Sequence, residues 1–262
     1  MNGTGPPDVA AGLATLAREK NVRILFAAES GSRAWGFASP DSDFDGRFLY
    51  VPEWRWYFSV FPPRDVIEAA LPGDLDLAGW ELRKALALFA RGNVPICEWL
   101  GSPIIYFEAP GFADELRALI PAVFNPAAAI FHYLGAARRT LERHLKSPEV
   151  RIKKVLYLLR PLLAARWIAE RRTMPPTPFA PLVDAFATGS ERPWIKNLLA
   201  RKAAAGEAET MRLDLETRQA WGDEVQRLEV LGPALSLQRE IPYRELDALL
   251  LRWAGPPGSA SK

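Results

Sequence analysis

The chain has 262 residues, of which 49% are hydrophobic and 24% charged, and this composition predicts a folded protein rather than a disordered one. Its single cysteine, Cys97, excludes an internal disulfide framework and favours a reducing compartment. No basic start followed by an apolar run opens the sequence, and two arginines and a proline interrupt the most apolar internal stretch, residues 155–168. We therefore expect a cytoplasmic protein that does not bind a membrane.

Charge is distributed unevenly along the chain. Basic and acidic residues number 11 and 16 over residues 1–126, 11 and 3 over 127–172, and 11 and 12 over 173–262. An acidic front part is typical of cation binding, and a basic segment is typical of contact with polyanions. The plainer interpretation of the basic segment is a solvated helix face.

The front of the chain has the patterns of helix and strand in alternation. Residues 8–19 space their apolar positions as an amphipathic helix, and residues 22–28, apolar except for Arg23, form a run that predicts a buried strand. A turn-rich stretch over 29–42 follows, and from residue 43 polar and apolar positions alternate as in a half-buried strand. The next expected elements are strands at 66–71 and 75–78 and a helix at 80–91.

From about residue 125 the pattern is helical, and strands are no longer expected. The predicted helices cover 126–145, 150–172, 181–187, 193–205, 207–231 and 241–254, with a kink at Pro161 in the second. We therefore predict an α+β protein with an α/β front domain over residues 1–125, an all-helical domain over 126–254 and a disordered tail over 255–262.

Two short motifs near the first strand carry the candidate chemistry. Of four Gly-Ser pairs, only Gly31-Ser32 directly follows a buried strand, where backbone N–H groups and the Ser32 hydroxyl can hold an anion. Asp43 and Asp45 come about ten residues later, and strand alternation places both on one face with their Cα atoms roughly 7 Å apart. Ordinary loop chemistry remains an alternative for this Gly-, Ser- and Asp-rich turn.

Paired carboxylates beside an anion-binding turn suit nucleotidyl transfer, because hard cations stabilise the charge that develops on the phosphates. Histidine and thiolate ligands are scarce, so we expect Mg²⁺ or Mn²⁺, as two ions, rather than zinc. Arg33 and Arg47 can neutralise phosphate oxygens or form ion pairs with the aspartates. The usual Walker and dinucleotide-binding glycine patterns are absent.

The run over residues 29–45, from Glu-Ser-Gly-Ser-Arg to Asp-Phe-Asp, resembles the active-site segment of the DNA polymerase β-like nucleotidyltransferase superfamily, specifically the RlaP (YcgL-like) family. Further similar segments lie at 56–60, 65–68, 75–86, 98–100 and 152–163. The resemblance implies a polymerase β-like mixed sheet with flanking helices, followed by a C-terminal all-helical domain.

By this resemblance, Gly31 and Ser32 hold the phosphates of a nucleoside triphosphate (NTP), while Asp43 and Asp45 bind metal. The family has a third carboxylate on a following strand, for which Asp76 is the first choice. Glu68 is the second choice and Asp74 the third. In such a triad the third carboxylate binds the metal near the acceptor hydroxyl and helps to remove its proton.

One position departs from the family pattern. Gly46 stands where the family usually has a branched apolar residue after the second aspartate. Glycine packs weakly within a strand and often marks a bulge, so we expect looser packing and a bulge at this position.

The resemblance implies a metal-dependent nucleotidyltransferase that moves a nucleoside monophosphate from an NTP, such as ATP, to a hydroxyl acceptor, an RNA 3′ end in RNA repair. Lys153 and Lys154, in the basic segment, are candidates to hold the pyrophosphate of the NTP or to bind RNA. Two alternatives stay open: nucleotidylation of a protein or small molecule, and a catalytically silent module that binds nucleotide or RNA. The sequence does not predict the nucleotide preference or the oligomeric state.

Overall fold

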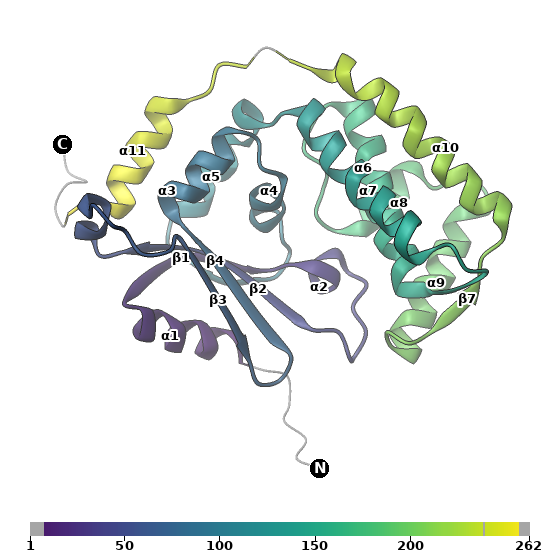
Figure 1. The fold of residues 1–262 in the computed structure, drawn as a ribbon, viewed down its shortest axis with the longest axis horizontal. Helices are drawn as coiled ribbons and strands as arrows, with labels where there is room; N and C mark the ends of the chain where they lie inside the picture. Colours follow the sequence, from purple (N-terminus) through teal and green to yellow (C-terminus); the bar gives the residue numbers. More distant parts are fainter. Residues whose placement is uncertain (1–7, 238, 257–262) are drawn as a thin grey trace. The chain divides into compact units, whose positions relative to one another are not determined.

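The structure, a computed structural model, describes residues 8–237 and 239–256 and has an α+β fold, as predicted (Figure 1). Its described residues fall into two compact units. Unit 1 comprises residues 8–34, 43–123 and 239–256, and unit 2 comprises residues 35–42 and 124–237. Most of the tail predicted to be disordered, residues 257–262, lies outside the described residues.

Unit 1 is built on a five-stranded mixed sheet. Its strands, in the spatial order β3-β4-β2-β1-β5, are β3 (Val66–Leu71), β4 (Leu75–Glu81), β2 (Phe44–Pro52), β1 (Val22–Glu29) and β5 (Ile105–Glu108). The β2–β4 pair is parallel, and the other three pairs are antiparallel. Four of these strands match predicted ones, whereas the short β5 was not expected from its sequence.

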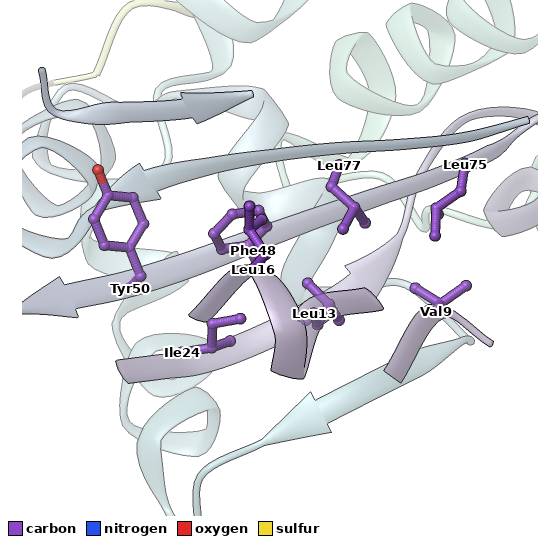
Figure 2. Close-up of a cluster of buried hydrophobic side chains, with 9 residues drawn as sticks. Val9, Leu13, Leu16, Ile24, Phe48, Tyr50, Leu75 and Leu77 are labelled. Carbon is purple, nitrogen blue, oxygen red and sulfur yellow. The ribbon is translucent and has the colours of Figure 1, made fainter. Parts of the chain in front are cut away.

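Helix α1 (Val9–Lys20) covers one face of the sheet and confirms the first predicted helix. Asp8 caps its start by accepting a hydrogen bond of 2.9 Å from the Ala11 N–H, and Asn21 ends it in the left-handed conformation. The apolar face of α1 packs against side chains from β1, β2 and β4 (Figure 2). The cluster consists of Val9, Leu13, Leu16, Ile24, Ala27, Phe48, Tyr50, Leu75 and Leu77.

The other face of the sheet in unit 1 is covered by helices (Figure 1). They are α3 (Leu82–Ala90), α4 (Val94–Leu100) and α5 (Phe112–Val123), with α11 (Tyr243–Ala254) packed on α3. The short helix η1 (Trp54–Phe58) follows β2. Glu81 is the last residue of β4 and the N-terminal cap of α3. Its carboxylate accepts hydrogen bonds of 2.7 and 3.1 Å from the Arg83 and Lys84 N–H groups, so the strand passes directly into the helix.

Unit 2 is mainly helical. Its elements are α6 (Pro126–His144), α7 (Ile152–Arg171), α8 (Phe179–Phe186), α9 (Glu191–Ala205), α10 (Leu215–Leu231), η2 (Gly232–Leu235) and a two-stranded sheet of β6 (Glu149–Arg151) and β7 (Thr210–Arg212). The prediction that strands stop after the front domain was therefore wrong, although both added strands have only three residues. Helix α7 continues unbroken through Pro161.

The division of the chain differs from the predicted domains at two places. The main change of unit, between residues 123 and 124, lies close to the expected boundary at 125, but α11 groups with unit 1. Residues 35–42, expected to belong to the front domain, form part of unit 2. Within the described ranges, no single helix is long and apolar enough to cross a membrane; only α5 and α6 taken together reach the required length and composition.

Candidate active site

The Gly-Ser motif lies where β1 ends and the five-residue helix α2 (Gly31–Trp35) begins. Gly31 has a φ of +61°, and a Cβ atom at this position would lie 2.5 Å from Asp45 Oδ2. Glycine is therefore required here both for the backbone conformation and for the approach of the carboxylate. The Ser30 N–H also donates a 2.9 Å hydrogen bond to the Asp45 carbonyl. The structure thus brings the predicted phosphate turn and the second predicted aspartate together.

Asp45 and Asp76 are direct neighbours on the parallel strands β2 and β4. The flanking Leu75 and Leu77 face α1, so strand alternation places both carboxylates on the opposite face of the sheet. A guanidinium nitrogen of Arg47 lies 2.9 Å from Asp45 Oδ1 and 2.8 Å from Asp76 Oδ2. Arg47 therefore bridges the two carboxylates, which is the ion-pair role considered for it in the sequence.

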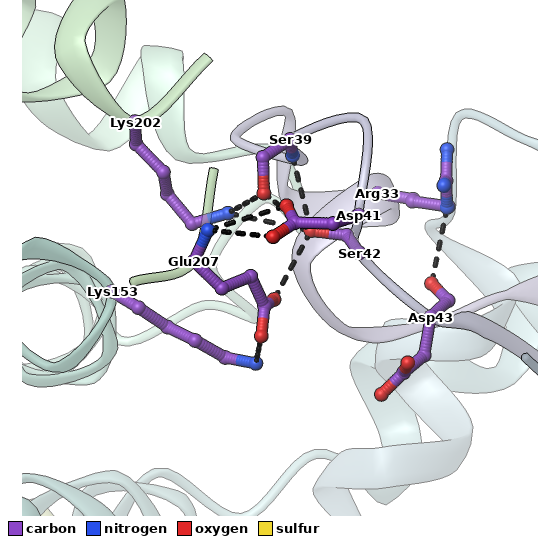
Figure 3. Close-up of polar contacts among 8 residues, drawn as sticks. All are labelled: Arg33, Ser39, Asp41, Ser42, Asp43, Lys153, Lys202 and Glu207. Atoms are coloured by element: carbon purple, nitrogen blue, oxygen red, sulfur yellow. Dashed lines mark hydrogen bonds and ion pairs between the residues drawn. The ribbon is translucent and has the colours of Figure 1, made fainter. Parts of the chain in front are cut away.

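Asp43 precedes β2 and is exposed to solvent. Its backbone carbonyl accepts a 3.0 Å hydrogen bond from Arg33 Nε (Figure 3). The Arg33 guanidinium also lies 3.6 Å from the centre of the Phe44 ring. Arg33 thus joins α2 to the start of β2, in addition to any role toward phosphate.

The alternatives for the third carboxylate occupy different positions from Asp76. Glu68 pairs with Ala78 across β3 and β4, is exposed, and forms an ion pair of 3.5 Å with Arg64. Asp74 lies in the β3–β4 turn with a φ of +56°. Asp76 is the only one of the three that is registered directly beside Asp45, so the geometry favours it over both alternatives.

Gly46 does not form the expected bulge. The β2 register with β4 runs without a shift past Gly46, and the irregularity in the β1–β2 pairing lies between Ile24 and Phe26. A Cβ atom at Gly46 would lie 2.4 Å from Leu77 Cδ2. The expectation of loose packing was therefore wrong: Leu77 fills the space that a branched side chain at position 46 would occupy.

Glu29 is a buried carboxylate that the sequence analysis did not single out. It ends β1 with no exposed surface, accepts a 2.7 Å hydrogen bond from the Asp45 N–H, and accepts another from the Tyr106 hydroxyl. Burial raises the pKa of Glu29 above its ordinary value, although these hydrogen bonds oppose the shift. An acidic residue at the end of a strand run that is apolar except for Arg23 was the available signal.

The described residues can be tested for their fit to a divalent cation. Among residues 8–237 and 239–256, no group of three or more acidic, histidine or cysteine side chains is arranged to hold a metal ion. The Asp45–Asp76 pair supplies oxygen ligands only, and Mg²⁺ is commonly held by one or two carboxylates together with substrate phosphates. The pair therefore fits Mg²⁺ bound together with an NTP, whereas Asp43 does not complete a three-carboxylate cluster.

Lys153 and Lys154, the predicted phosphate ligands, lie in unit 2 at the start of α7. Lys153 Nζ forms an ion pair with Glu207, and both lysine ammonium groups lie within 6 Å of the Tyr157 ring, at 5.6 and 5.8 Å. Burial, followed by the charges of Lys153 and Arg151, lowers the pKa of Lys154. Lys154 is thus a cation that an anionic ligand would stabilise.

The basic segment of unit 2 is partly neutralised within the fold. Arg138 pairs with Glu229, and Arg166 Nε lies 2.7 Å from Glu224 Oε1, both on α10. Arg160, which also belongs to the basic segment, is buried and donates a 3.3 Å hydrogen bond to the Thr177 carbonyl. The positive charge of α7 is therefore not all presented on its surface, because the helix packs Arg160 into the core of unit 2.

Comparison with known proteins decides the family. The profile of the RlaP family, described as the RNA repair pathway DNA polymerase beta family, matches residues 7–252. The chain belongs to this family. A Bacillus subtilis (strain 168) protein named YcgL is 44% identical over 236 residues, which cover 88% of this chain and 89% of that protein. Membership of this RlaP family identifies the chain as nucleotidyltransferase-like.

A solved structure of a nucleotidyltransferase-like protein from Exiguobacterium sibiricum 255-15 also aligns with the chain. It shares 14% sequence identity, covers 95% of this chain and 76% of its own, and gives a TM-score of 0.30. A TM-score of 0.30 is too low to establish a shared fold. The assignment to the RlaP family therefore rests on the family profile and on the similarity to YcgL.

Proposed function

We propose that this RlaP protein is a metal-dependent nucleotidyltransferase that moves a nucleoside monophosphate from an NTP to a hydroxyl acceptor, an RNA 3′ end. The observation that carries the proposal is the position of the Asp45 carboxylate, which lies against Gly31 and beside Asp76. This arrangement joins a turn suited to phosphates with a pair of carboxylates suited to a hard cation.

The reaction assigns a role to each side chain. The acceptor oxygen attacks the α-phosphorus, the bond from that phosphorus to the bridging oxygen breaks, and pyrophosphate leaves with the electron pair. Gly31 and Ser32 hold the phosphates through backbone N–H groups, and Asp76 accepts the proton of the acceptor hydroxyl. A bound Mg²⁺ or Mn²⁺ would be held by Asp45 and Asp76, and also by Asp43 once its exposed side chain turns toward that pair, and would neutralise phosphate charge.

Arg47 has two roles in this proposal. Without substrate it neutralises Asp45 and Asp76, which otherwise repel each other across adjacent strands. When cation and NTP bind, the guanidinium is released from the carboxylates and can bind phosphate oxygens, for which its planar donors are suited. Binding of the cation and rearrangement of Arg47 are then coupled.

The acceptor is proposed from charge. Lys154 on α7 in unit 2 is a cation whose pKa is lowered by burial and by neighbouring positive charge, and Lys153 lies with it beside the Tyr157 ring. Both features suit a single-stranded polyanion, and the family description concerns RNA repair. Binding through such contacts should weaken steeply as salt is raised.

The test incubates the purified chain with each α-labelled NTP, MgCl₂ or MnCl₂, and RNA with a free 3′ hydroxyl. We expect label in the RNA and release of pyrophosphate, both reduced by at least about 100-fold in Asp45→Asn and Asp76→Asn. Glu68→Gln is the matched control, since it removes a charge from β3 and should leave the transfer intact. RNA with a 3′ phosphate should not be labelled, because its 3′ oxygen is blocked and it has no 3′ hydroxyl.

A catalytically silent binding module is the second candidate, and the observation that favours it is the occupation of the Asp45–Asp76 pair by Arg47. Nucleotide binding without pyrophosphate release, for every NTP and cation tried, would support that module and refute the transferase. Label in a protein or small molecule rather than RNA would keep the transferase and change its acceptor.

A further inference from the structure

The segment that joins the two predicted motifs is part of the helical unit. Residues 35–42 group with unit 2, whereas Gly31, Ser32 and Asp43 belong to unit 1. The segment is covalently joined to the phosphate turn at its start and to Asp43 at its end. Whatever fixes residues 35–42 within unit 2 therefore also restrains the backbone of both motifs.

A buried lysine binds the end of this segment. Lys202, on α9, has no exposed surface, and its Nζ donates hydrogen bonds of 3.0 Å to Ser39 Oγ and 3.4 Å to Ser42 Oγ (Figure 3). The two hydroxyl oxygens lie 3.0 Å apart, and the Ser39 N–H donates to Ser42 Oγ at 3.0 Å. Ser42 is the residue immediately before Asp43.

The turn after α9 holds the same segment from a second side. The Glu207 N–H donates to both carboxylate oxygens of Asp41, at 3.2 and 3.0 Å, and Ser42 Oγ donates to Glu207 Oε1 at 3.2 Å. Gly206 has a φ of +84°, and a Cβ atom there would lie 2.8 Å from Asp41 Oδ2. Glycine is required at 206 for this close approach.

Aromatic packing fixes the start of the segment. Phe37 is buried, and its ring lies 6.0 Å from that of Tyr157 and 5.6 Å from that of Phe179. Trp35 contacts the Tyr157 ring edge-on at 5.3 Å. Both ends of the segment are thus held by residues of unit 2.

The chemistry of this contact favours a positioning role over simple packing. An ammonium group is costly to bury, and an apolar side chain of similar length would fill the same volume without that cost. What the ammonium adds is direction, because it donates to two hydroxyl oxygens that are three residues apart and so fixes the turn between them.

We propose that Lys202 is a positioning residue that fixes the Ser39–Ser42 turn and, through the peptide bond after Ser42, the place of Asp43. This proposal rests on the proposed transferase function for its effect on catalysis. The anchoring of the turn by Lys202 can be measured without substrate. The anchoring and the proposed transferase function can therefore be refuted independently.

The test compares Lys202→Met with Lys196→Met in the full chain. Both variants remove one ammonium from α9, but Lys196 is exposed and serves as the matched control. Hydrogen–deuterium exchange of the peptide covering residues 36–45 should become at least about 10-fold faster in Lys202→Met only. The kcat for NTP transfer should fall on the order of 100-fold, while KM for NTP should change less than about 3-fold.

Ser42→Ala is the second variant, because it removes one acceptor and keeps the buried ammonium on Ser39. Ser42→Ala should also speed exchange in residues 36–45 and lower kcat, but by less than Lys202→Met. This test remains available even if Lys202→Met fails to fold. Unchanged exchange and unchanged kcat in Ser42→Ala, or in a folded Lys202→Met, would overturn the proposal. Faster exchange in a chain whose wild type transfers no nucleotide would support the anchoring and refute the transferase function.

Discussion

Arg47 offers the sharpest test of how the carboxylates are used. Replacing it by methionine keeps much of the aliphatic stem but leaves Asp45 and Asp76 as neighbouring, uncompensated charges on adjacent strands. The contact with Asp45 is mostly shielded from solvent, with exposed side-chain fractions of 19% and 29%, and a charged hydrogen bond of this kind contributes about 1.5–3 kcal/mol. The Asp76 side chain is 52% exposed, so its contact adds no more than about 1 kcal/mol.

We therefore expect Arg47→Met to lower the free energy of unfolding by about 2–3 kcal/mol in the presence of EDTA, as measured by urea titration. Adding MgCl₂ should recover most of this loss in the variant and should stabilise the wild type less. The reason is that the cation in the variant binds carboxylates that no guanidinium occupies, and ligand binding stabilises by mass action. Lys84→Met, which removes the 2.7 Å ion pair with Asp65 on the same unit, is the control.

Two results would refute this reasoning. A variant as stable as the wild type in EDTA would mean that the bridge contributes nothing to stability. Equal stabilisation of both proteins by MgCl₂, or none of either, would mean that Arg47 and the cation do not compete for the carboxylates.

Three further predictions concern neighbouring positions. Gly31→Ala should abolish nucleotide transfer and lower the free energy of unfolding by about 1–3 kcal/mol, since the new Cβ meets Asp45 Oδ2 at a positive φ. Full activity in the variant would refute this prediction. Gly46→Val should lower the free energy of unfolding, measured with urea, by about 1–3 kcal/mol, because the new side chain meets Leu77 Cδ2. The double variant Gly46→Val/Leu77→Ala should lose less stability than the sum of the two single variants, and strict additivity would refute this explanation. Because the folded pKa of Glu29 is raised above its ordinary value of 4.5, the folded chain binds this proton more tightly than the unfolded chain, and stability is lost as pH rises from 4.5 through the raised value. The free energy of unfolding of Glu29→Gln should therefore rise relative to that of the wild type over this pH range. A difference between the two proteins that does not vary with pH would contradict the prediction.

The sequence predicted the elements whose pattern is local. The apolar run of β1, the alternation of β2 and the spacing of α1 and α3 each follow from which side chains must be buried. The same alternation placed Asp45 on the face of β2 opposite Phe48 and Tyr50, which pack in the cluster under α1. The prediction of Asp76 came from the family resemblance, and the register of β2 with β4 then placed it beside Asp45.

Other features could not be read from local pattern. The strand β5 has four residues with exposed Ile105 and Phe107, and β6 and β7 have three residues each, so their pairing depends on distant partners. The packing of residues 35–42 into the helical unit depends on Lys202, which lies 160 residues away from Ser42 in sequence. A lysine in a helical pattern predicts an exposed side chain, and only the tertiary contacts show that this one is buried.

The C-terminal helix α11 has a consequence for synthesis on the ribosome. It packs on α3, the Arg252–Glu115 ion pair measures 2.7 Å, and the Trp253 ring lies 5.2 Å from that of Phe112. Unit 1 is therefore incomplete until the last helix has been translated, whereas every described residue of unit 2 emerges before that helix does. The helical unit can therefore fold before α11 has been made, and a released chain truncated before residue 243 should carry a folded unit 2 and a unit 1 that lacks the cover of α11 on α3.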